Sequence, residues 1–125
     1  MQGKQTRQQI SGSHTERSAE ALLQGHGLKT LARNYRCKAG EIDLIMLDQD
    51  YLVFVEVRLR SNSDYVSALE SVDRRKQNKL IRSAQLFLQQ NPHYGQHFCR
   101  FDVVASEHSA ANAQELVWIK DAFQN

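Results

Sequence analysis

Two adjacent segments with strong β-strand character, Glu41 to Leu47 and Tyr51 to Leu59, constrain the fold more than any other feature. The first alternates acidic and aliphatic residues, and the second is rich in β-branched and aromatic residues. Both patterns are typical of strands. Because only the polar residues Asp48-Gln49-Asp50 separate the segments, they predict a β-hairpin with a short turn.

The register of this hairpin decides which acidic residues meet. Side chains alternate across a strand, so Glu41 and Asp43 share one face of the first segment, and Glu56 and Arg58 share one face of the second. A two-residue loop would set Asp43 opposite Glu56 and Glu41 opposite Arg58. An odd-length loop would mix the acidic and apolar faces, so we predict the even register.

The opposed carboxylates of Asp43 and Glu56 need a compensating charge. Cβ atoms of opposed residues lie only about 4.5 to 5.5 Å apart, and like charges at that distance destabilise the pair. Glu56 also lies in the most hydrophobic segment of the chain, where an unpaired carboxylate is costly to bury. Either Arg58 forms an ion pair there or a divalent cation binds, since Mg²⁺ is typically held by carboxylates, waters and phosphate oxygens.

The rest of the chain predicts a single α/β domain over residues 14–125, preceded by a mobile tail over 1–13 that has little to bury. Ser13 and Glu16 form a capping-box pattern at the start of the first helix. The predicted elements outside the hairpin are a helix over 14–24, a strand over 28–35, a helix over 67–90 that ends at Asn91-Pro92, and strands over 98–106 and 116–120. The order is therefore α, β, β, β, α, β, β.

The second predicted helix has one apolar and one basic face. Its apolar stripe is formed by Leu80, Ile81, Ala84, Phe87 and Leu88. The basic residues opposite are Arg75, Lys79 and Arg82, with Lys76 at the boundary of the stripe. This spacing is that of a helix packed on a core.

The small net charge of +2 hides an uneven distribution. Four positive charges and no acid fall within 29–38, five more fall within 74–82, and residues 101–125 have a net charge of −3. Basic blocks of this kind suit a phosphate-binding surface, although each would also be an ordinary solvated face.

Composition excludes several other classes of protein. The 125 residues contain no apolar run near the roughly 20 residues that a membrane helix needs. The N-terminal residues contain no apolar core of a secretory signal. Cys37 and Cys99 lie far apart, as expected for reduced thiols. We therefore expect a cytoplasmic protein that does not bind membranes.

Four motifs resemble the YraN-like family of small bacterial proteins, and the resemblance runs from Glu16 to about Phe123. The family is similar to the PD-(D/E)xK nuclease superfamily, near the archaeal Holliday-junction resolvases. The motifs are GEIDLI at 40–45, VFVEVRLR at 53–60, RKQ at 75–77 and RFDV at 100–103.

This resemblance implies a restriction-endonuclease-like core, in which a mixed central sheet is flanked by helices. It also implies that Asp43, Glu56 and the backbone carbonyl of Val57 hold Mg²⁺ or Mn²⁺. Arg58 stands where the superfamily usually has a lysine. Because arginine stays protonated, Arg58 could clamp a phosphate or stabilise developing charge but could not act as a general base.

Three further residues match the family, each with two interpretations. Glu16 matches a helix glutamate that approaches the metal site in related resolvases, or it is part of the capping box. Lys76 matches a recurrent lysine that could reach the site, or it is a solvated helix residue. Asp102 of the RFDV motif is a sheet-end carboxylate or a partner of Arg100.

The sequence thus predicts a metal-dependent nuclease that acts on phosphodiester bonds of DNA or RNA, with DNA, including structured or branched DNA, as the expected substrate. Asp43, Glu56, Arg58 and Glu16 are the expected catalytic residues. The residues expected to bind nucleic acid are Arg36, Lys38, Arg60, Arg75, Lys76 and Lys79. The alternatives are a nucleic-acid-binding module without turnover, suggested by Arg58, and an adaptor that uses Trp118 and Phe123. Related resolvases act as dimers, so a homodimer is also expected.

Overall fold

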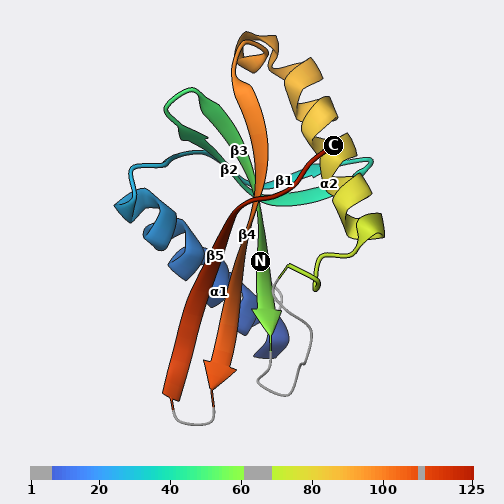
Figure 1. Ribbon diagram of the computed structural model, residues 1–125. Coiled ribbons are helices and arrows are strands. Elements are labelled where there is room, and N and C mark those ends of the chain that lie inside the picture. Colours follow the sequence, from blue (N-terminus) through green and yellow to red (C-terminus); the bar gives the residue numbers. More distant parts are fainter. Residues whose placement is uncertain (1–6, 61–68, 110–111) are drawn as a thin grey trace, which may run out of the picture.

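The computed structural model describes residues 7–60, 69–109 and 112–125, and the side chains within 14–59, 69–106 and 115–125. The elements are helix α1 (Arg7–Gly25), strands β1 (Lys29–Cys37), β2 (Gly40–Asp48) and β3 (Tyr51–Arg60), helix α2 (Arg74–Gln90), the short 3₁₀ helix η1 (Pro92–Tyr94), and strands β4 (Phe98–Ser109) and β5 (Asn112–Phe123). The predicted mixed α/β fold and its order of helices and strands are confirmed (Figure 1).

The five strands form one mixed sheet in which spatial order follows chain order, from β1 to β5. Neighbouring strands are antiparallel except β3 and β4, which are parallel. A parallel pair needs a long crossover connection, and α2 lies within the connection between these two strands.

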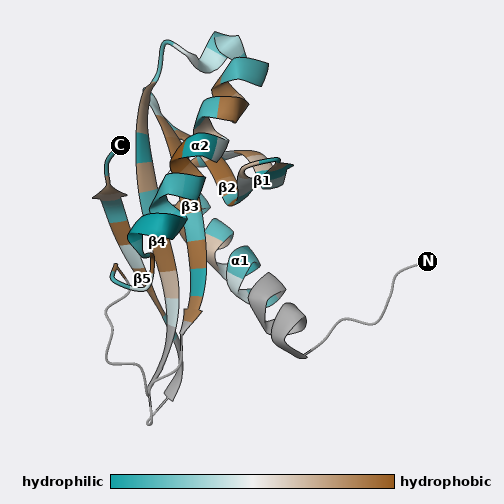
Figure 2. Ribbon diagram, turned by 90° about the vertical axis from the view of Figure 1, so that its right-hand side faces the viewer, coloured by the Kyte–Doolittle hydropathy of each residue, from teal (hydrophilic) through white to brown (hydrophobic). Residues whose placement is uncertain are grey.

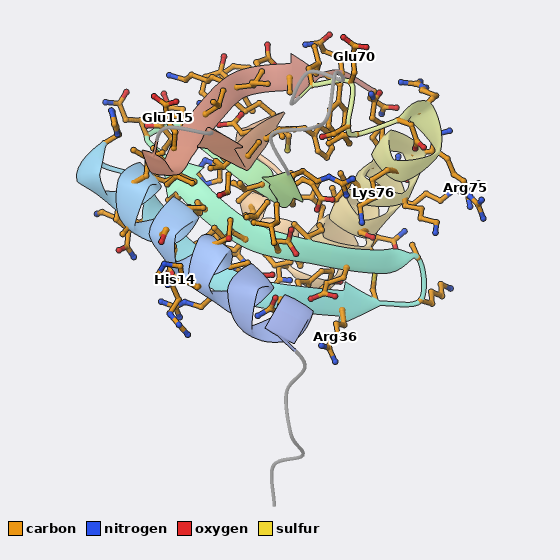
Figure 3. All side chains as sticks on the ribbon, turned by 90° about the horizontal axis from the view of Figure 1, so that it is seen from below. His14, Arg36, Glu70, Arg75, Lys76 and Glu115 are labelled. Carbon is orange, nitrogen blue, oxygen red and sulfur yellow. The ribbon has the colours of Figure 1, made fainter. Side chains whose placement is uncertain are left out.

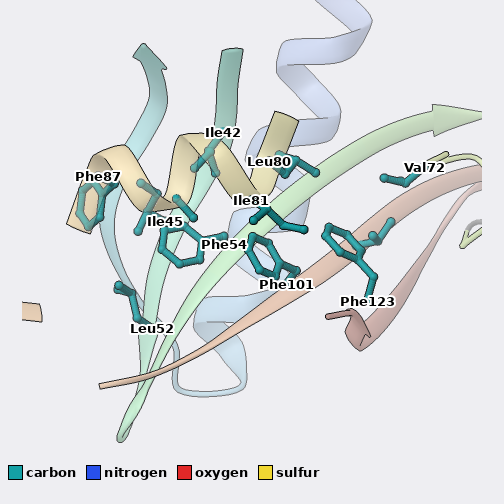
Figure 4. Close-up of a cluster of buried hydrophobic side chains, with 12 residues drawn as sticks. Ile42, Ile45, Leu52, Phe54, Val72, Leu80, Ile81, Phe87, Phe101 and Phe123 are labelled. Atoms are coloured by element: carbon teal, nitrogen blue, oxygen red, sulfur yellow. The ribbon is translucent and has the colours of Figure 1, made fainter. Parts of the chain in front are cut away.

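The two helices cover opposite faces of the sheet, so the central strands are buried on both sides. α2 packs on a cluster that includes Ile42 of β2 and Phe54 of β3 (Figure 4). α1 packs on a second cluster that includes Leu44 and Val53. This explains why all four residues from Leu52 to Val55 are apolar, since strands buried on both faces lose the alternation of polar and apolar residues.

Helix α2 has the two faces that its sequence predicts. Leu80, Ile81, Ala84 and Phe87 are buried, whereas Arg82 on the opposite side is exposed. Figure 2 shows both hydrophilic and hydrophobic residues along α2. The predicted end of the helix is also confirmed, because α2 stops at Gln90, before Asn91-Pro92.

The predicted starts of both helices were wrong. α1 begins at Arg7, so Ser13 lies inside the helix and does not form a capping box with Glu16. Residues 7–13 of the predicted tail are therefore helical, and residues 1–6 lie outside the described part of the chain. Gln and Arg are good helix formers and the segment contains no proline, so the helix continues across it although Gly12 weakens it.

α2 begins later than predicted, because an aspartate caps it. The Asp73 side chain accepts a hydrogen bond from the backbone N–H of Lys76 at 2.8 Å. This satisfies one of the free donors at the helix start. Residues 69–72 form a turn, in which Val72 is buried, and residues 61–68 lie outside the described part of the chain.

The C-terminal hairpin is longer than predicted, since β4 extends to Ser109 and β5 runs from Asn112 to Phe123. Phe123 is buried in the cluster under α2, and Trp118 is half-buried against the cluster under α1. Both residues therefore have a packing role, which removes the support for the adaptor interpretation. Within the described residues, no helix is long and apolar enough to cross a membrane.

Candidate functional site

The β2–β3 hairpin has the predicted even register. Regular pairing runs from Asp48 opposite Tyr51 to Leu44 opposite Val55, across a two-residue turn. Gln49 in this turn has a φ of 54°, within the left-handed region. The predicted register is therefore confirmed from Asp48 to Leu44, and the predicted pairs of Asp43 with Glu56 and of Glu41 with Arg58 lie beyond this regular pairing.

Beyond Leu44, where the regular backbone pairing ends, a side-chain hydrogen bond links the two strands. Asp43 Oδ2 accepts a hydrogen bond from the backbone N–H of Val57 at 2.8 Å. This contact holds the Asp43 carboxylate between β2 and β3, next to Glu56. We call Asp43 and Glu56 the carboxylate pair.

Glu56 lies in an environment that disfavours its charge. It is 3% exposed. Burial raises its pKa to about 8, and the charge of Asp43 and hydrogen bonding to Asp43 act in the same direction. Two carboxylates held this closely favour a shared proton, so they would also favour a bound cation.

Two cationic side chains approach the same oxygen of Glu56. Lys76 Nζ lies 3.4 Å from Glu56 Oε2, and Arg58 Nη1 lies 3.6 Å from it. The Arg58 ion pair, one of the two alternatives that the sequence left open, is therefore present. Lys76 reaches the carboxylate pair while part of its side chain stays exposed. Figure 3 shows it on the side of α2 toward the sheet, with Arg75 pointing outward.

Glu16 approaches the carboxylate pair from α1, on the other side of β2. Burial raises its pKa, and the charges of Asp43 and Glu41 raise it further. With its amide nitrogen oriented toward the two carboxylates, Asn34 donates to Glu41 Oε1 at 3.1 Å and to Glu16 Oε2 at 3.2 Å. Glu16 therefore belongs to the surroundings of the pair, as the family resemblance implies.

Glu41 was expected opposite Arg58, and this prediction was wrong. In the sheet it is instead paired with Arg36 of β1, and Arg36 Nε lies 3.8 Å from Glu41 Oε1. The cause is the end of regular β2–β3 pairing at Leu44, beyond which β2 continues along β1 alone.

A cavity of about 160 Å³ opens on the α1 side of Asp43, and Glu56 is not among the residues that line it. Its lining residues are Glu16, Arg17, Glu20, Arg33, Asn34, Asp43 and Leu44. Glu20 is not available to a ligand, because Arg33 binds it at 2.7 Å and holds the pKa of its carboxyl below the usual value. The volume is that of a few water molecules, enough for a partly hydrated cation.

The donor set suits a hard cation that keeps some of its water. No group of three His, Cys, Asp or Glu side chains able to enclose a metal occurs within the described residues. Mg²⁺ does not need one, since it commonly binds through one or two carboxylates, waters and substrate phosphates. The carboxylate pair supplies two ligands of the kind that Mg²⁺ uses, and the Val57 carbonyl remains a predicted ligand.

The turn that follows the first basic segment lies against α2, which carries the second. A side chain at Gly40 would lie 3.9 Å from Lys79 Cβ, so the turn between β1 and β2 rests against α2. Arg36 and Lys38 on this turn are exposed, as is Arg75 on α2. The side chain of Arg60 lies outside the described residues.

Asp102 has a structural environment. It is 0% exposed and accepts hydrogen bonds from Arg100 Nε at 3.0 Å, Trp118 Nε1 at 3.0 Å and the Asp121 backbone N–H at 2.9 Å. Arg100 also donates to Asp48 at 3.0 Å. These five residues form the Arg100 cluster, and the interpretation of Asp102 as a partner of Arg100 is confirmed.

Sequence reasoning missed three residues around the site: Asn34, Ser71 and Asp73. Asp73 had a usable signal, because an aspartate directly before a helical pattern is a preferred cap. Asn34 and Ser71 act through contacts between distant segments, for which the local sequence has no signal.

Comparison with known proteins places most of the chain in one group. Residues 15–105 match the family described as "Uncharacterised protein family UPF0102". A UPF0102 protein of Pseudomonas putida strain GB-1 is 53% identical over 114 residues, which cover 91% of this chain and 93% of the relative. A UPF0102 protein of Pseudomonas syringae pv. syringae strain B728a is 52% identical over 120 residues, which cover 96% and 97%.

Proposed function

The chain belongs to UPF0102, the YraN-like family, and we propose that it is a nuclease that uses Mg²⁺ or Mn²⁺ to hydrolyse phosphodiester bonds, with DNA as the preferred substrate. One observation carries this proposal. A nearly fully buried glutamate, Glu56, is held against a second carboxylate, with two cationic side chains at 3.4 and 3.6 Å. Strongly perturbed carboxylates with specific charged neighbours are typical of functional sites.

Each residue of the site has a distinct task. Asp43 and Glu56, with the Val57 carbonyl, would hold the cation. When bound, the cation supplies polarisation of a phosphate oxygen and activation of a water molecule. The Val57 N–H fixes the orientation of Asp43, and Glu16 adds negative charge on the α1 side. In the reaction, water adds to phosphorus, the bond to the leaving oxygen breaks, and the leaving oxygen takes up a proton.

The basic surface beside the site would bind the nucleic-acid backbone. Arg36 and Lys38 come from one segment, and Arg75 and Lys79 from another. Contacts between such residues and phosphates position a nucleic acid and do not read its sequence. We therefore expect recognition of structure or charge, with affinity that falls steeply as salt increases.

A nucleic-acid-binding module without turnover is the second candidate. The observation that favours it is Arg58, which occupies the strand position of the usual superfamily lysine and cannot accept a proton. This candidate keeps the basic surface and gives no role to the carboxylate pair.

The experiment compares cleavage of duplex, single-stranded and branched DNA, and of RNA, with Mg²⁺ or Mn²⁺. The variants are Asp43→Asn, which retains an acceptor for the Val57 N–H, and Asp50→Asn, an exposed control on the same hairpin. We expect cutting by wild type and the control, and a loss of about 100-fold or more in Asp43→Asn.

The same samples are tested for binding with Ca²⁺ in place of Mg²⁺. Binding without cutting in wild type would support the second candidate. Equal cutting by wild type and Asp43→Asn would contradict the proposed nuclease site. Neither binding nor cutting would contradict both candidates.

A further inference from the structure

We infer that Lys76 of α2 contacts the scissile phosphate, in the place of a lysine on β3, and that Arg58 is a positioning residue. This inference rests on the proposed nuclease function and assigns a role within the same site. The observation behind it is that α2 brings an ammonium group to the carboxylate pair, whereas the guanidinium on β3 is held by the protein itself.

Arg58 is fixed at two points. Its Nη2 donates to the backbone carbonyl of Ser71 at 3.0 Å, and its Nη1 lies 3.6 Å from Glu56. A planar guanidinium bound in this way has little freedom to follow a reacting phosphate. Ser71 lies two residues before Asp73, the cap of α2, so Arg58 links β3 to the segment that starts this helix.

The backbone of Lys76 is placed precisely by the same segment. Asp73 accepts its N–H at 2.8 Å. The next residue, Gln77, donates to the Val72 carbonyl at 2.9 Å through its side chain, and Val72 is buried. The first turn of α2 is thus tied to the core, and it holds the Lys76 backbone at one position relative to Glu56.

The side chain of Lys76, in contrast, is able to turn. It has a flexible four-carbon stem and a compact ammonium with three donors. The Lys76 side chain is 36% exposed, close to the 37% of Arg58, so both face the solvent and the difference between them lies in how each side chain is held. Lys76 therefore has a fixed backbone position and a mobile ammonium group. A group that contacts both Glu56 and an incoming phosphate needs both properties.

Lys76 and a metal ion would compete for Glu56. Both are cations, and Lys76 lies 3.4 Å from the Oε2 atom of that carboxylate. Removing the lysine charge should therefore tighten metal binding in the absence of nucleic acid, while slowing the reaction. These opposite effects separate a role at the phosphate from a role in maintaining the carboxylate pair.

The test measures kcat, KM and Mn²⁺ affinity for wild type, Lys76→Gln, Lys76→Arg and two controls. Lys120→Gln removes an exposed lysine on β5, far along the chain from the site. Lys79→Gln removes an exposed lysine one turn along α2, within the basic surface. Mn²⁺ affinity is measured by calorimetry on the protein alone.

We expect Lys76→Gln to lower kcat by about 100-fold, as for loss of one preorganised donor to developing charge, with a small change in KM. Its Mn²⁺ affinity should rise about threefold to tenfold. Lys76→Arg should return Mn²⁺ affinity toward wild type and restore part of kcat. Lys79→Gln should mainly raise KM, and Lys120→Gln should match wild type.

Cutting by Lys76→Gln at the wild-type kcat would overturn the assignment of Lys76 and leave the proposed nuclease function intact. Unchanged Mn²⁺ affinity in that variant would also overturn it. Absence of cutting by wild type would overturn the proposed function, and the role of Lys76 with it.

Discussion

The carboxylate pair and the Arg100 cluster both bury carboxylates beside cations, and they do so in opposite ways. Asp102 is surrounded by donors, with hydrogen bonds from Arg100, Trp118 and the Asp121 backbone. Glu56 is surrounded by another carboxylate and by two cations beyond close hydrogen-bond distance. A buried charge that is fully paired stabilises a fold, whereas one that is incompletely compensated keeps affinity for a ligand.

The largest expected effect is the fall in stability when the Arg100 cluster is disrupted. Asp102→Ala would remove the acceptor of three donors and leave Arg100 buried with Asp48 as its remaining carboxylate among the described residues. We expect the free energy of unfolding to fall by about 3 to 5 kcal/mol in chemical denaturation. The control Glu115→Ala, exposed on β5, should change it by less than about 0.5 kcal/mol. A loss below about 1 kcal/mol in Asp102→Ala would contradict the stabilising role assigned to the Arg100 cluster.

The second effect is a fall in stability at alkaline pH, caused by Glu56. Its pKa is about 8 in the folded protein, above the value of about 4.5 for the unfolded chain, so the folded protein binds the proton more tightly. This contribution is fully present below about pH 4.5 and is lost as the pH rises toward 8. With a chelator present, unfolding free energy should fall by about 2 kcal/mol between pH 6 and pH 9.

Glu56→Gln, which is neutral at every pH, should flatten this profile. The same substitution should abolish cleavage, so stability and activity would change in opposite directions at pH 9. A wild-type stability that does not change over this range would contradict the incompletely compensated state of Glu56.

The third effect is stabilisation by divalent cations. Mg²⁺ or Mn²⁺ at 10 to 100 times its dissociation constant should raise the unfolding free energy by about 1.4 to 2.7 kcal/mol. Thermal unfolding should show this shift in wild type and Asp50→Asn and should not show it in Asp43→Asn. A shift of equal size in Asp43→Asn would place the cation elsewhere on the protein.

The smallest effect concerns the basic surface. Lys79→Gln should reduce the slope of log affinity for DNA against log salt by about 1, the value for one lost phosphate contact. The matched control, Lys120→Gln, should leave the slope unchanged. Equal salt slopes for wild type, Lys79→Gln and Lys120→Gln would exclude Lys79 from the surface that binds DNA.

Local sequence predicts the hairpin that carries the site because two independent signals in it indicate the same strand pairing. The turn at Gln49-Asp50 and the alternation before it require the same register, and the structure has that register as far as Leu44. The family resemblance then placed Asp43, Glu56 and Glu16 together, and the contacts of Glu16 agree with it.

Local sequence predicts the ends of elements and the long-range neighbours less well. Ser13 and Glu16 have the spacing of a cap, but the helix continues through them because residues 7–12 contain no proline and Gly12 alone does not end the helix. Glu41 was assigned to Arg58 on the assumption that pairing with β3 continues, whereas the neighbouring strand β1 offers Arg36. The direction in which Lys76 points depends on where α2 begins, and that depends on Asp73 and on the contact between Arg58 and Ser71.

The proposed site and the C-terminal hairpin occupy separate parts of the chain. Glu16, Asp43, Glu56 and Lys76 come from α1, β2, β3 and the start of α2, all within the first 76 residues. The β4–β5 hairpin borders β3 on its other edge and supplies none of these four side chains. It acts on the site through the sheet, because it supplies buried residues such as Phe101 and Val104 and holds β3 in place as its parallel neighbour.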